Sequence, residues 1–269
     1  MYWHIGLMKT GSTYYQRKIW PNLKNKYFVG WHTKETDQQW NDPRIKNMVY
    51  KLRYDKDFKE VKYFQKLTNS LPKNTLISDE GIITDGRTQL RNIGRIKEID
   101  QEAKVIVFVR DECQWLLSQY YQYRRGVLSG KKIDHISLEE WMEINTEKNR
   151  AVKKDLLTKN IEEYITKKNY IIIEYEDVKN NIPKVAEQLG DFLGEDKYEL
   201  LKTMVIESKI EHARLKTIIP KTISRTLNKF GISRILAKGN KAMKYLAWDG
   251  YVEEDVKKVL EDRDISVDK

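Results

Sequence analysis

The segment that most constrains this fold is residues 2–20, where a short apolar stretch leads into a glycine-bounded turn and then into a helical sequence. Residues 2–5 read as a strand, the turn runs from Gly6 to Gly11, and Pro21 ends the helical run. A strand, a glycine turn and a helix start together direct backbone N–H groups and the positive end of the helix towards an anion. The segment therefore predicts an anion site, and phosphate is the anion it favours.

The spacing of the two glycines also occurs in P-loops, but the position of the lysine differs. A P-loop that binds a nucleoside triphosphate has lysine directly after the second glycine, from where it reaches the β- and γ-phosphates. Here Ser12 stands at that position, and the lysine lies inside the turn as Lys9. The loop therefore fits a ligand with a different phosphate chain. A P-loop kinase of a small metabolite stays open as an alternative.

Residues 9–13, Lys-Thr-Gly-Ser-Thr, resemble the first motif of the sulfotransferases, which is close to Pro-Lys-Thr-Gly-[Thr/Ser]-[Thr/Ser]. Met8 stands where proline is usual. In that family the motif holds the 5′-phosphosulfate of PAPS, 3′-phosphoadenosine 5′-phosphosulfate. A helix start with an incidental lysine is the other interpretation. The resemblance implies that the residues binding PAPS include Lys9, Thr10, Gly11, Ser12 and Thr13.

A second motif follows the apolar run Val105–Val109, which is typical of a strand buried on both faces of a parallel sheet. Arg110 ends this run, and Ser118 comes eight residues later in a helical sequence. A guanidinium and a hydroxyl placed in this way can converge on one phosphate. The pair resembles the second sulfotransferase motif, whose Arg and Ser bind the 3′-phosphate of PAPS.

Glu80 ends the short strand-like sequence Thr75–Ser78, and a carboxylate at the ligand edge of a sheet can act as a general base towards a hydroxyl. Ile77-Ser78-Asp79-Glu80 resembles a stretch of the carbohydrate-type sulfotransferases in which a glutamate has that role. Asp79 is an alternative base. His4 and His32 are two others, although His4 lies within the first strand and is expected to pack there.

Strand-like and helical sequences alternate over residues 2 to about 194, which predicts a doubly wound α/β fold with a parallel, P-loop-like sheet flanked by helices. No linker, repeat or low-complexity tract interrupts the 269 residues, so one domain over residues 1–269 is expected. The single cysteine, Cys113, excludes an internal disulfide and provides no metal cluster. With no secretory signal at the start, a cytoplasmic location is expected.

The formal net charge of +10 indicates an anionic partner, and the charge is unevenly distributed. Residues 212–248 carry nine basic residues and no acidic one, interleaved with apolar side chains. This pattern favours short amphipathic helices with a basic face, suited either to an anionic membrane or to guiding an anionic ligand by its field. The nine are Arg214, Lys216, Lys221, Arg225, Lys229, Arg234, Lys238, Lys241 and Lys244.

Taken together, the motifs predict a sulfotransferase that moves a sulfo group from PAPS to a hydroxyl of a carbohydrate or glycolipid acceptor. Glu80 would take the proton, Lys9 would stabilise charge on the bridging oxygen, and adenosine 3′,5′-bisphosphate (PAP) would leave without a metal. A non-catalytic protein that binds an anion or a membrane is the rival from another class, and nucleic acid is not expected as a partner. The acceptor's identity and the oligomeric state have no signal in the sequence.

Overall fold

The computed structural model describes residues 1–30, 40–128, 136–149 and 153–205. His32, Trp31 and the basic segment 212–248 lie outside this part of the chain. The described chain forms two compact units: Met1–Glu112 with the segment from Asn145 onwards, and Cys113–Ile144. The prediction of one domain over residues 1–269 stays a prediction, because the positions of the two units relative to one another are not determined.

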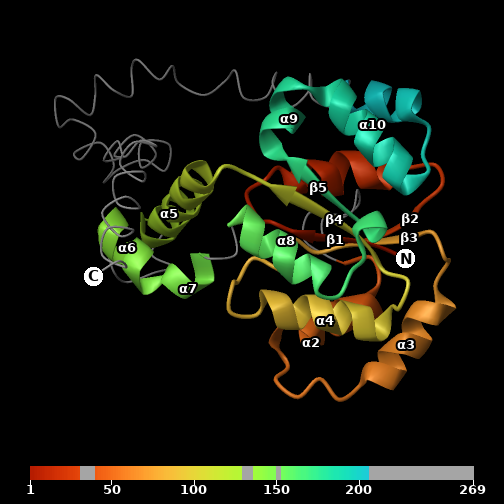
Figure 1. The fold of residues 1–269 in the computed structure, drawn as a ribbon, viewed down its shortest axis with the longest axis horizontal. Helices are drawn as coiled ribbons and strands as arrows, with labels where there is room; N and C mark the ends of the chain where they lie inside the picture. Colours follow the sequence, from red (N-terminus) through yellow and green to blue (C-terminus); the bar gives the residue numbers. More distant parts are fainter. Residues whose placement is uncertain (31–39, 129–135, 150–152, 206–269) are drawn as a thin grey trace. The chain divides into compact units, whose positions relative to one another are not determined.

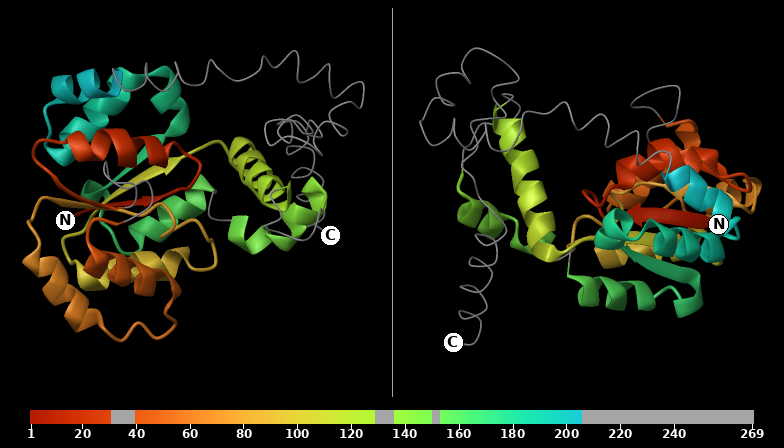
Figure 2. Two further views of the ribbon diagram at one scale, coloured as in Figure 1. Left: turned by 180° about the vertical axis from the view of Figure 1, so that it is seen from behind. Right: turned by 90° about the horizontal axis from the view of Figure 1, so that it is seen from above.

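The first unit is built on a five-stranded sheet in the order β2-β3-β1-β4-β5, with every neighbouring pair parallel. This confirms the predicted doubly wound α/β fold, since helices pack on both faces of the sheet (Figures 1 and 2). The strands are β1 (Tyr2–Gly6), β2 (Tyr27–Gly30), β3 (Thr75–Ser78), β4 (Lys104–Val109) and β5 (Tyr170–Glu174).

Both faces of the sheet are covered because the central strands are apolar on both sides. Along β4, Ile106 and Phe108 are fully buried on one face, in a cluster with Trp20 and Leu189. The residues that alternate with them, such as Val107, are fully buried as well. The continuous apolar run that predicted this strand is therefore explained by helices above and below it.

The helices of the first unit begin and end at the signals that the sequence provides. Asp42 caps α2 by accepting hydrogen bonds from the backbone of Arg44 and Ile45, and Gly194 ends α10 in a left-handed conformation. The helices are α1 (Ser12–Tyr14), η1 (Tyr15–Ile19), η2 (Trp20–Asn22), α2 (Pro43–Tyr54), α3 (Val61–Ser70), α4 (Gln89–Ile99), α7 (Thr146–Asn149), α8 (Lys154–Glu162), η4 (Lys167–Asn169), α9 (Tyr175–Asn180) and α10 (Ile182–Leu193).

The second unit contains most of α5 (Glu112–Leu128) and all of α6 (Leu138–Ile144). Ser137 caps α6, because its hydroxyl accepts a hydrogen bond from the backbone N–H of Glu140 at 3.1 Å. The Tyr120 hydroxyl donates to the backbone oxygen of Ile136 at 3.0 Å, and the Tyr120 ring contacts Trp141. These contacts join α5 to α6 within the unit.

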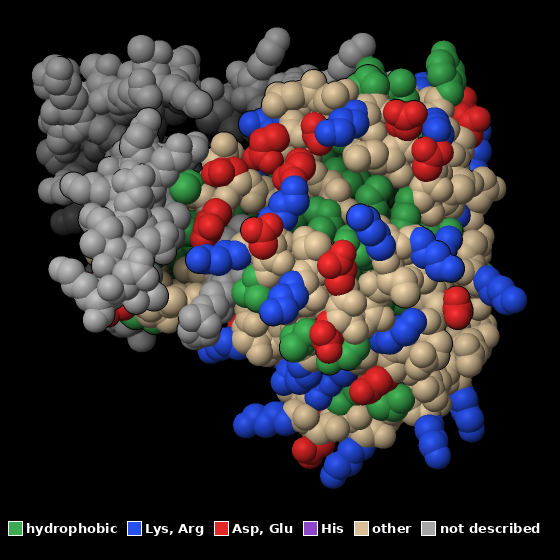
Figure 3. Space-filling view, viewed as in Figure 1, with side chains coloured by type: hydrophobic (Ala, Val, Ile, Leu, Met, Phe, Trp, Pro, Cys, Tyr) green, Lys and Arg blue, Asp and Glu red, His purple; other side chains and the backbone are tan. Residues whose placement is uncertain are grey.

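Charged side chains are mixed on the face shown in Figure 3, where Lys and Arg alternate with Asp and Glu over most of the described surface. Lys and Arg dominate only along the lower margin of that view, where Figure 1 shows α2 and α3. Within the described ranges, no helix combines the length and the apolar character that crossing a membrane requires.

Candidate active site

The loop after β1 has a backbone suited to enclosing an anion. Lys9 and Gly11 have φ angles of 67° and 81°, so left-handed residues are interspersed with ordinary ones and neighbouring N–H groups can face one point. The Thr10 and Ser12 hydroxyls both donate to the backbone oxygen of Leu7, which holds the turn from inside. Thr13 is exposed at the start of the helix. The loop therefore has the form that the glycine spacing predicted.

Gly6 and Gly11 are required for two reasons, because each has a positive φ angle and each lies too close to another part of the chain for a side chain to fit easily. A Cβ at Gly6, where φ is 137°, would lie 2.8 Å from the backbone oxygen of Glu80. A Cβ at Gly11 would lie 3.3 Å from the ring of Tyr175. Gly6 thus allows the backbone of Glu80 to pass beside the loop, and Gly11 allows an aromatic ring to lie against it.

The structure brings Arg110 to the same loop. Its guanidinium Nη1 donates to the backbone oxygen of Lys9 at 3.3 Å, and its Cζ lies 4.8 Å from the centre of the Tyr175 ring. Tyr175 begins α9 directly after β5, so the carboxyl ends of β1, β4 and β5 meet here. Lys9 and Arg110 are therefore neighbours, as two motifs for one ligand require.

Ser118 lies in the second turn of α5 and belongs to the second unit. Its position relative to Arg110 and the loop is not determined. The assignment of Ser118 to the 3′-phosphate consequently stays a prediction from the sequence.

Glu80 lies against the phosphate-type loop. Its carboxylate lies near the Ser12 hydroxyl and near Lys9, both of which act on its pKa. Thr84 ties the two segments together, since its hydroxyl donates to the backbone oxygen of Glu80 at 2.7 Å and accepts from the backbone N–H of Met8 at 3.3 Å. Burial raises the pKa of Glu80, and the nearby Ser12 hydroxyl and Lys9 oppose this rise. A raised pKa favours proton uptake, as a general base requires.

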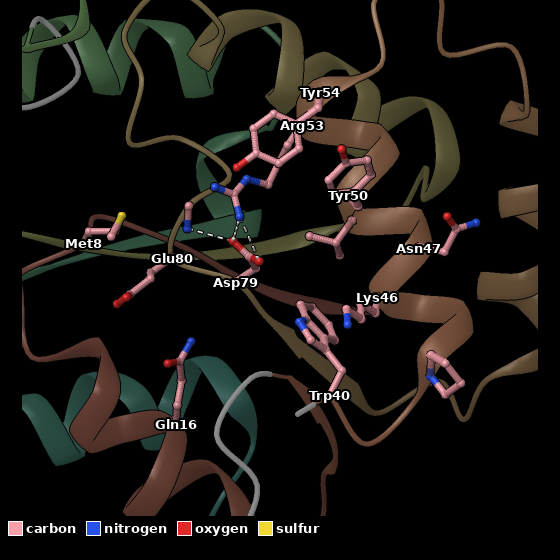
Figure 4. A pocket seen from close by; sticks show the side chains of 13 residues that line it. Met8, Gln16, Trp40, Lys46, Asn47, Tyr50, Arg53, Tyr54, Asp79 and Glu80 are labelled. Carbon is pink, nitrogen blue, oxygen red and sulfur yellow. Dashed lines mark hydrogen bonds and ion pairs between the residues drawn. The ribbon is translucent and has the colours of Figure 1, made fainter. Parts of the chain in front are cut away.

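A cavity of about 570 Å³ opens beside Glu80, between the loop, the end of β3 and α2 (Figure 4). Aromatic side chains form part of its wall, and Tyr50 and Tyr54, on successive turns of α2, contact each other with ring centres 5.0 Å apart and planes tilted by 51°. The thirteen lining residues are Met8, Gln16, Trp40, Pro43, Lys46, Asn47, Val49, Tyr50, Arg53, Tyr54, Asp79, Glu80 and Gly81.

Asp79 and His4, the two other described candidates for the base, are engaged elsewhere. Asp79 pairs with Arg53, whose Nη1 lies 3.1 Å from one carboxylate oxygen, and it accepts from the backbone N–H of Gly81 at 2.7 Å. His4 is fully buried in β1 with Nδ1 2.7 Å from the Ser78 hydroxyl, and burial lowers its pKa to about 3. The expectation that His4 packs within the strand is confirmed, and Glu80 is the carboxylate in contact with the loop.

Sequence reasoning missed three residues of this site, namely Arg53, Gln16 and Tyr175. Arg53 and Gln16 lie on helical segments and line the cavity, while Tyr175 lies against the loop at Gly11. Only Tyr175 had a signal, since it follows a strand whose end lies at the ligand edge of the sheet.

Replacing Arg53 with Met is expected to lower the free energy of unfolding by about 2–3 kcal/mol, because it leaves Asp79 buried without its cation. Burial already raises the pKa of Asp79, so the native state holds its proton to higher pH than the unfolded chain and the free energy of unfolding falls as pH rises through that window. Removing Arg53 raises this pKa further. Urea unfolding should therefore show that Arg53→Met loses more of the free energy of unfolding at pH 8 than at pH 5.

The matched control for this prediction is Lys59→Met, which removes a lysine paired with Asp57 at 3.8 Å with both side chains mostly exposed. An exposed pair contributes little, so this change should stay within about 0.5 kcal/mol at either pH. Equal effects of the two substitutions would show that the Arg53–Asp79 pair does not support the site.

Comparison with known proteins identifies the family. Residues 3–244 match the family described as "Sulfotransferase domain", so the chain belongs to the sulfotransferases, enzymes that transfer a sulfo group from PAPS. A solved sulfotransferase from Alicyclobacillus acidocaldarius is 13% identical, with a TM-score of 0.47 over 73% of this chain and 81% of that chain. Mouse sulfotransferase SULT7A1 complexed with PAP is 14% identical, with a TM-score of 0.48 over 82% of this chain and 68% of that chain. No curated protein matches the chain.

Proposed function

We propose that this sulfotransferase moves the sulfo group of PAPS to a hydroxyl of a carbohydrate or glycolipid acceptor. The observation that supports this most strongly is the position of Glu80, which contacts the loop through Ser12 and also lines the cavity of about 570 Å³. A donor on the loop and an acceptor in the cavity would meet at this carboxylate. Glu80 would then act as the general base.

The transfer is a single in-line displacement. The acceptor oxygen forms a bond to sulfur while the bond between sulfur and the bridging oxygen of PAPS breaks. The acceptor's proton goes to Glu80, and PAP leaves with the electron pair of the broken bond. Lys9 stabilises the negative charge that develops on the bridging oxygen, so positioning and electrostatics lower the barrier and no metal is required.

The nucleotide is held at both of its ends. The loop residues Lys9 to Thr13 bind the 5′-phosphosulfate, and the left-handed Lys9 and Gly11 support this because they let neighbouring backbone N–H groups face one anion. Arg110 and Ser118 bind the 3′-phosphate. The contact of Arg110 with the backbone of Lys9 supports this arrangement because it brings a second fixed cation to the loop.

A sugar acceptor fits the chemistry of the cavity wall. Trp40, Tyr50 and Tyr54 are large flat side chains with polar edges, and they line the same cavity as the carboxylate that would take the proton. Incubation of the protein with PAPS and with glycan or glycolipid extracts tests this. We expect carbohydrate products carrying one added sulfo group. Sulfation only of proteins or of simple phenols would contradict a carbohydrate acceptor.

The basic segment 212–248 is proposed to hold the protein at the anionic inner face of a membrane, from a cytoplasmic location. Each Lys or Arg near such a surface adds about 1 kcal/mol, and the segment carries nine basic residues and no acidic one. Liposome sedimentation should show binding to anionic vesicles that falls as salt rises. Replacing Lys229, Arg234 and Lys238 with Gln should abolish it.

The matched control replaces three lysines of the first unit, Lys56, Lys62 and Lys66, with Gln, and this variant should still sediment with the vesicles. If the unaltered protein ignores anionic vesicles even at low salt, the segment has another role, such as guiding PAPS by its field, and a soluble acceptor is favoured.

A further inference from the structure

Gln16 has an unused hydrogen-bonding atom at the wall of the cavity. The side chain is 1% exposed, and its Nε2 donates to the Ser78 hydroxyl at 3.0 Å. Its carbonyl oxygen, Oε1, has no hydrogen-bond partner within the part of the chain that the structure describes. Leaving a buried polar atom without a partner is unfavourable, so such an atom in a binding cavity indicates a ligand group.

The direction of this carbonyl is fixed from beneath the site. The Ser78 hydroxyl accepts a hydrogen bond from Gln16 and is itself hydrogen-bonded to Nδ1 of His4 at 2.7 Å. His4 is fully buried, with its ring edge-to-face against Trp20 and Phe108, and cannot turn away. The Gln16 amide is therefore held with its nitrogen towards Ser78 and its oxygen towards the cavity.

Gln16 and Glu80 face the same space. Figure 4 shows the two side chains extending towards each other from η1 and from the end of β3. Ser12, whose hydroxyl lies near the Glu80 carboxylate, precedes Gln16 by four residues, about one helical turn along the same segment. Two hydrogen-bond acceptors thus lie side by side at the cavity wall, one on Glu80 and one on Gln16.

From this juxtaposition we infer that the acceptor is a vicinal diol of a pyranose ring. Glu80 takes the proton of the hydroxyl that is sulfated, and the Gln16 carbonyl accepts a hydrogen bond from the hydroxyl on the neighbouring ring carbon. Gln16 is thus a specificity-determining residue, oriented by Ser78 and His4. This inference rests on the proposed function, because it assigns the substrate class of the same site.

An acceptor with one isolated hydroxyl would leave the Gln16 carbonyl buried and unpaired. Because its own polar group would be left unpaired, a site that binds a hydroxyl discriminates strongly against an analogue that lacks this hydroxyl. The rate should therefore depend on a hydroxyl that does not itself react.

The test compares methyl pyranosides of glucose, galactose and mannose with their monodeoxy analogues, using PAPS as donor. For the best of these acceptors, removal of the hydroxyl next to the sulfated one should lower kcat/KM about 10- to 100-fold. In Gln16→Met, which keeps the length of the side chain but has no carbonyl, the two acceptors should differ by less than about threefold. Ser78→Ala removes the hydroxyl that orients the Gln16 amide. Its ratio of kcat/KM for the two acceptors should lie between that of the unaltered protein and that of Gln16→Met.

Gln65→Met is the matched control. Gln65 is a half-buried glutamine on α3 that donates to the backbone oxygen of Glu98 and does not line this cavity. This variant should keep the full discrimination. Affinity for PAP and the unfolding midpoint of Gln16→Met should stay close to those of the unaltered protein. If Gln16→Met does not fold, the unaltered protein still tests the inference through the kcat/KM values of the pyranosides and their monodeoxy analogues.

The outcomes separate this inference from the proposed function. Transfer from PAPS to pyranosides with no preference for the diol would overturn the inference and leave the proposed function intact. Equal discrimination in Gln16→Met and the unaltered protein would do the same. Transfer to octanol or p-nitrophenol in preference to every pyranoside would overturn both the inference and the carbohydrate acceptor. No transfer from PAPS to any of these acceptors, together with no binding of PAP, would overturn both.

Discussion

Replacing Glu80 with Gln is expected to lower turnover by roughly 10²–10⁴-fold while the affinity for PAP changes little. The amide keeps the shape of the side chain and its contact with Ser12, but it cannot accept the acceptor's proton. Burial raises the pKa of Glu80, so the rate of the unaltered protein should fall as pH drops through a value above the ordinary range for Glu. Steady-state kinetics over pH, with PAP affinity from calorimetry, measures both effects.

Glu98→Gln is the matched control for this substitution, because Glu98 is an exposed glutamate on α4. It should retain both the turnover and the pH profile of the unaltered protein. A Glu80→Gln variant with normal turnover would contradict the assignment of the base. The role would then pass to Asp79 or His32.

Replacing Arg110 with Ala is expected to weaken the binding of PAP by roughly 10- to 150-fold, the effect of losing about 1.5–3 kcal/mol from a charge-assisted hydrogen bond. Adenosine 5′-phosphate lacks the 3′-phosphate, so its affinity should fall much less. Arg110 is held for this contact by the backbone oxygen of Lys9 and by the Tyr175 ring. Calorimetry with the two nucleotides measures the difference.

Arg87→Ala controls for the loss of a positive charge, since the Arg87 side chain is mostly exposed and pairs with Asp85. It should leave both affinities unchanged. Equal losses for the two nucleotides in Arg110→Ala would show that the guanidinium does not bind the 3′-phosphate.

Local sequence signals predicted the elements of the fold well, because each signal acts over a few residues. The apolar run at 105–109 reflects burial on both faces, and β4 covers it. The cap of α6 is equally local, since the Ser137 hydroxyl accepts a hydrogen bond from the backbone N–H of Glu140 three residues on. The loop of Lys9 has the left-handed residues that its glycine spacing indicated.

Contacts between distant segments could not be read from the sequence in the same way. Tyr175 lies against Gly11 and Arg110 only because the ends of three strands meet at one edge of the sheet. In the sequence Gln16 is an ordinary residue of a helical segment, and only the structure shows that its amide donates to the Ser78 hydroxyl. The pairing of Arg53 with Asp79 likewise depends on how α2 packs beside β3.

The most direct test of the site is hydrogen exchange of the backbone with and without PAP. If the loop after β1 and the end of β4 hold one nucleotide, PAP should slow exchange at residues 6–16 and around Arg110. Exchange should not change around Asp100, which lines a second cavity of about 580 Å³ containing none of the residues assigned to the nucleotide. Protection confined to Asp100 and its neighbours, or no protection at residues 6–16 under saturating PAP, would contradict the account.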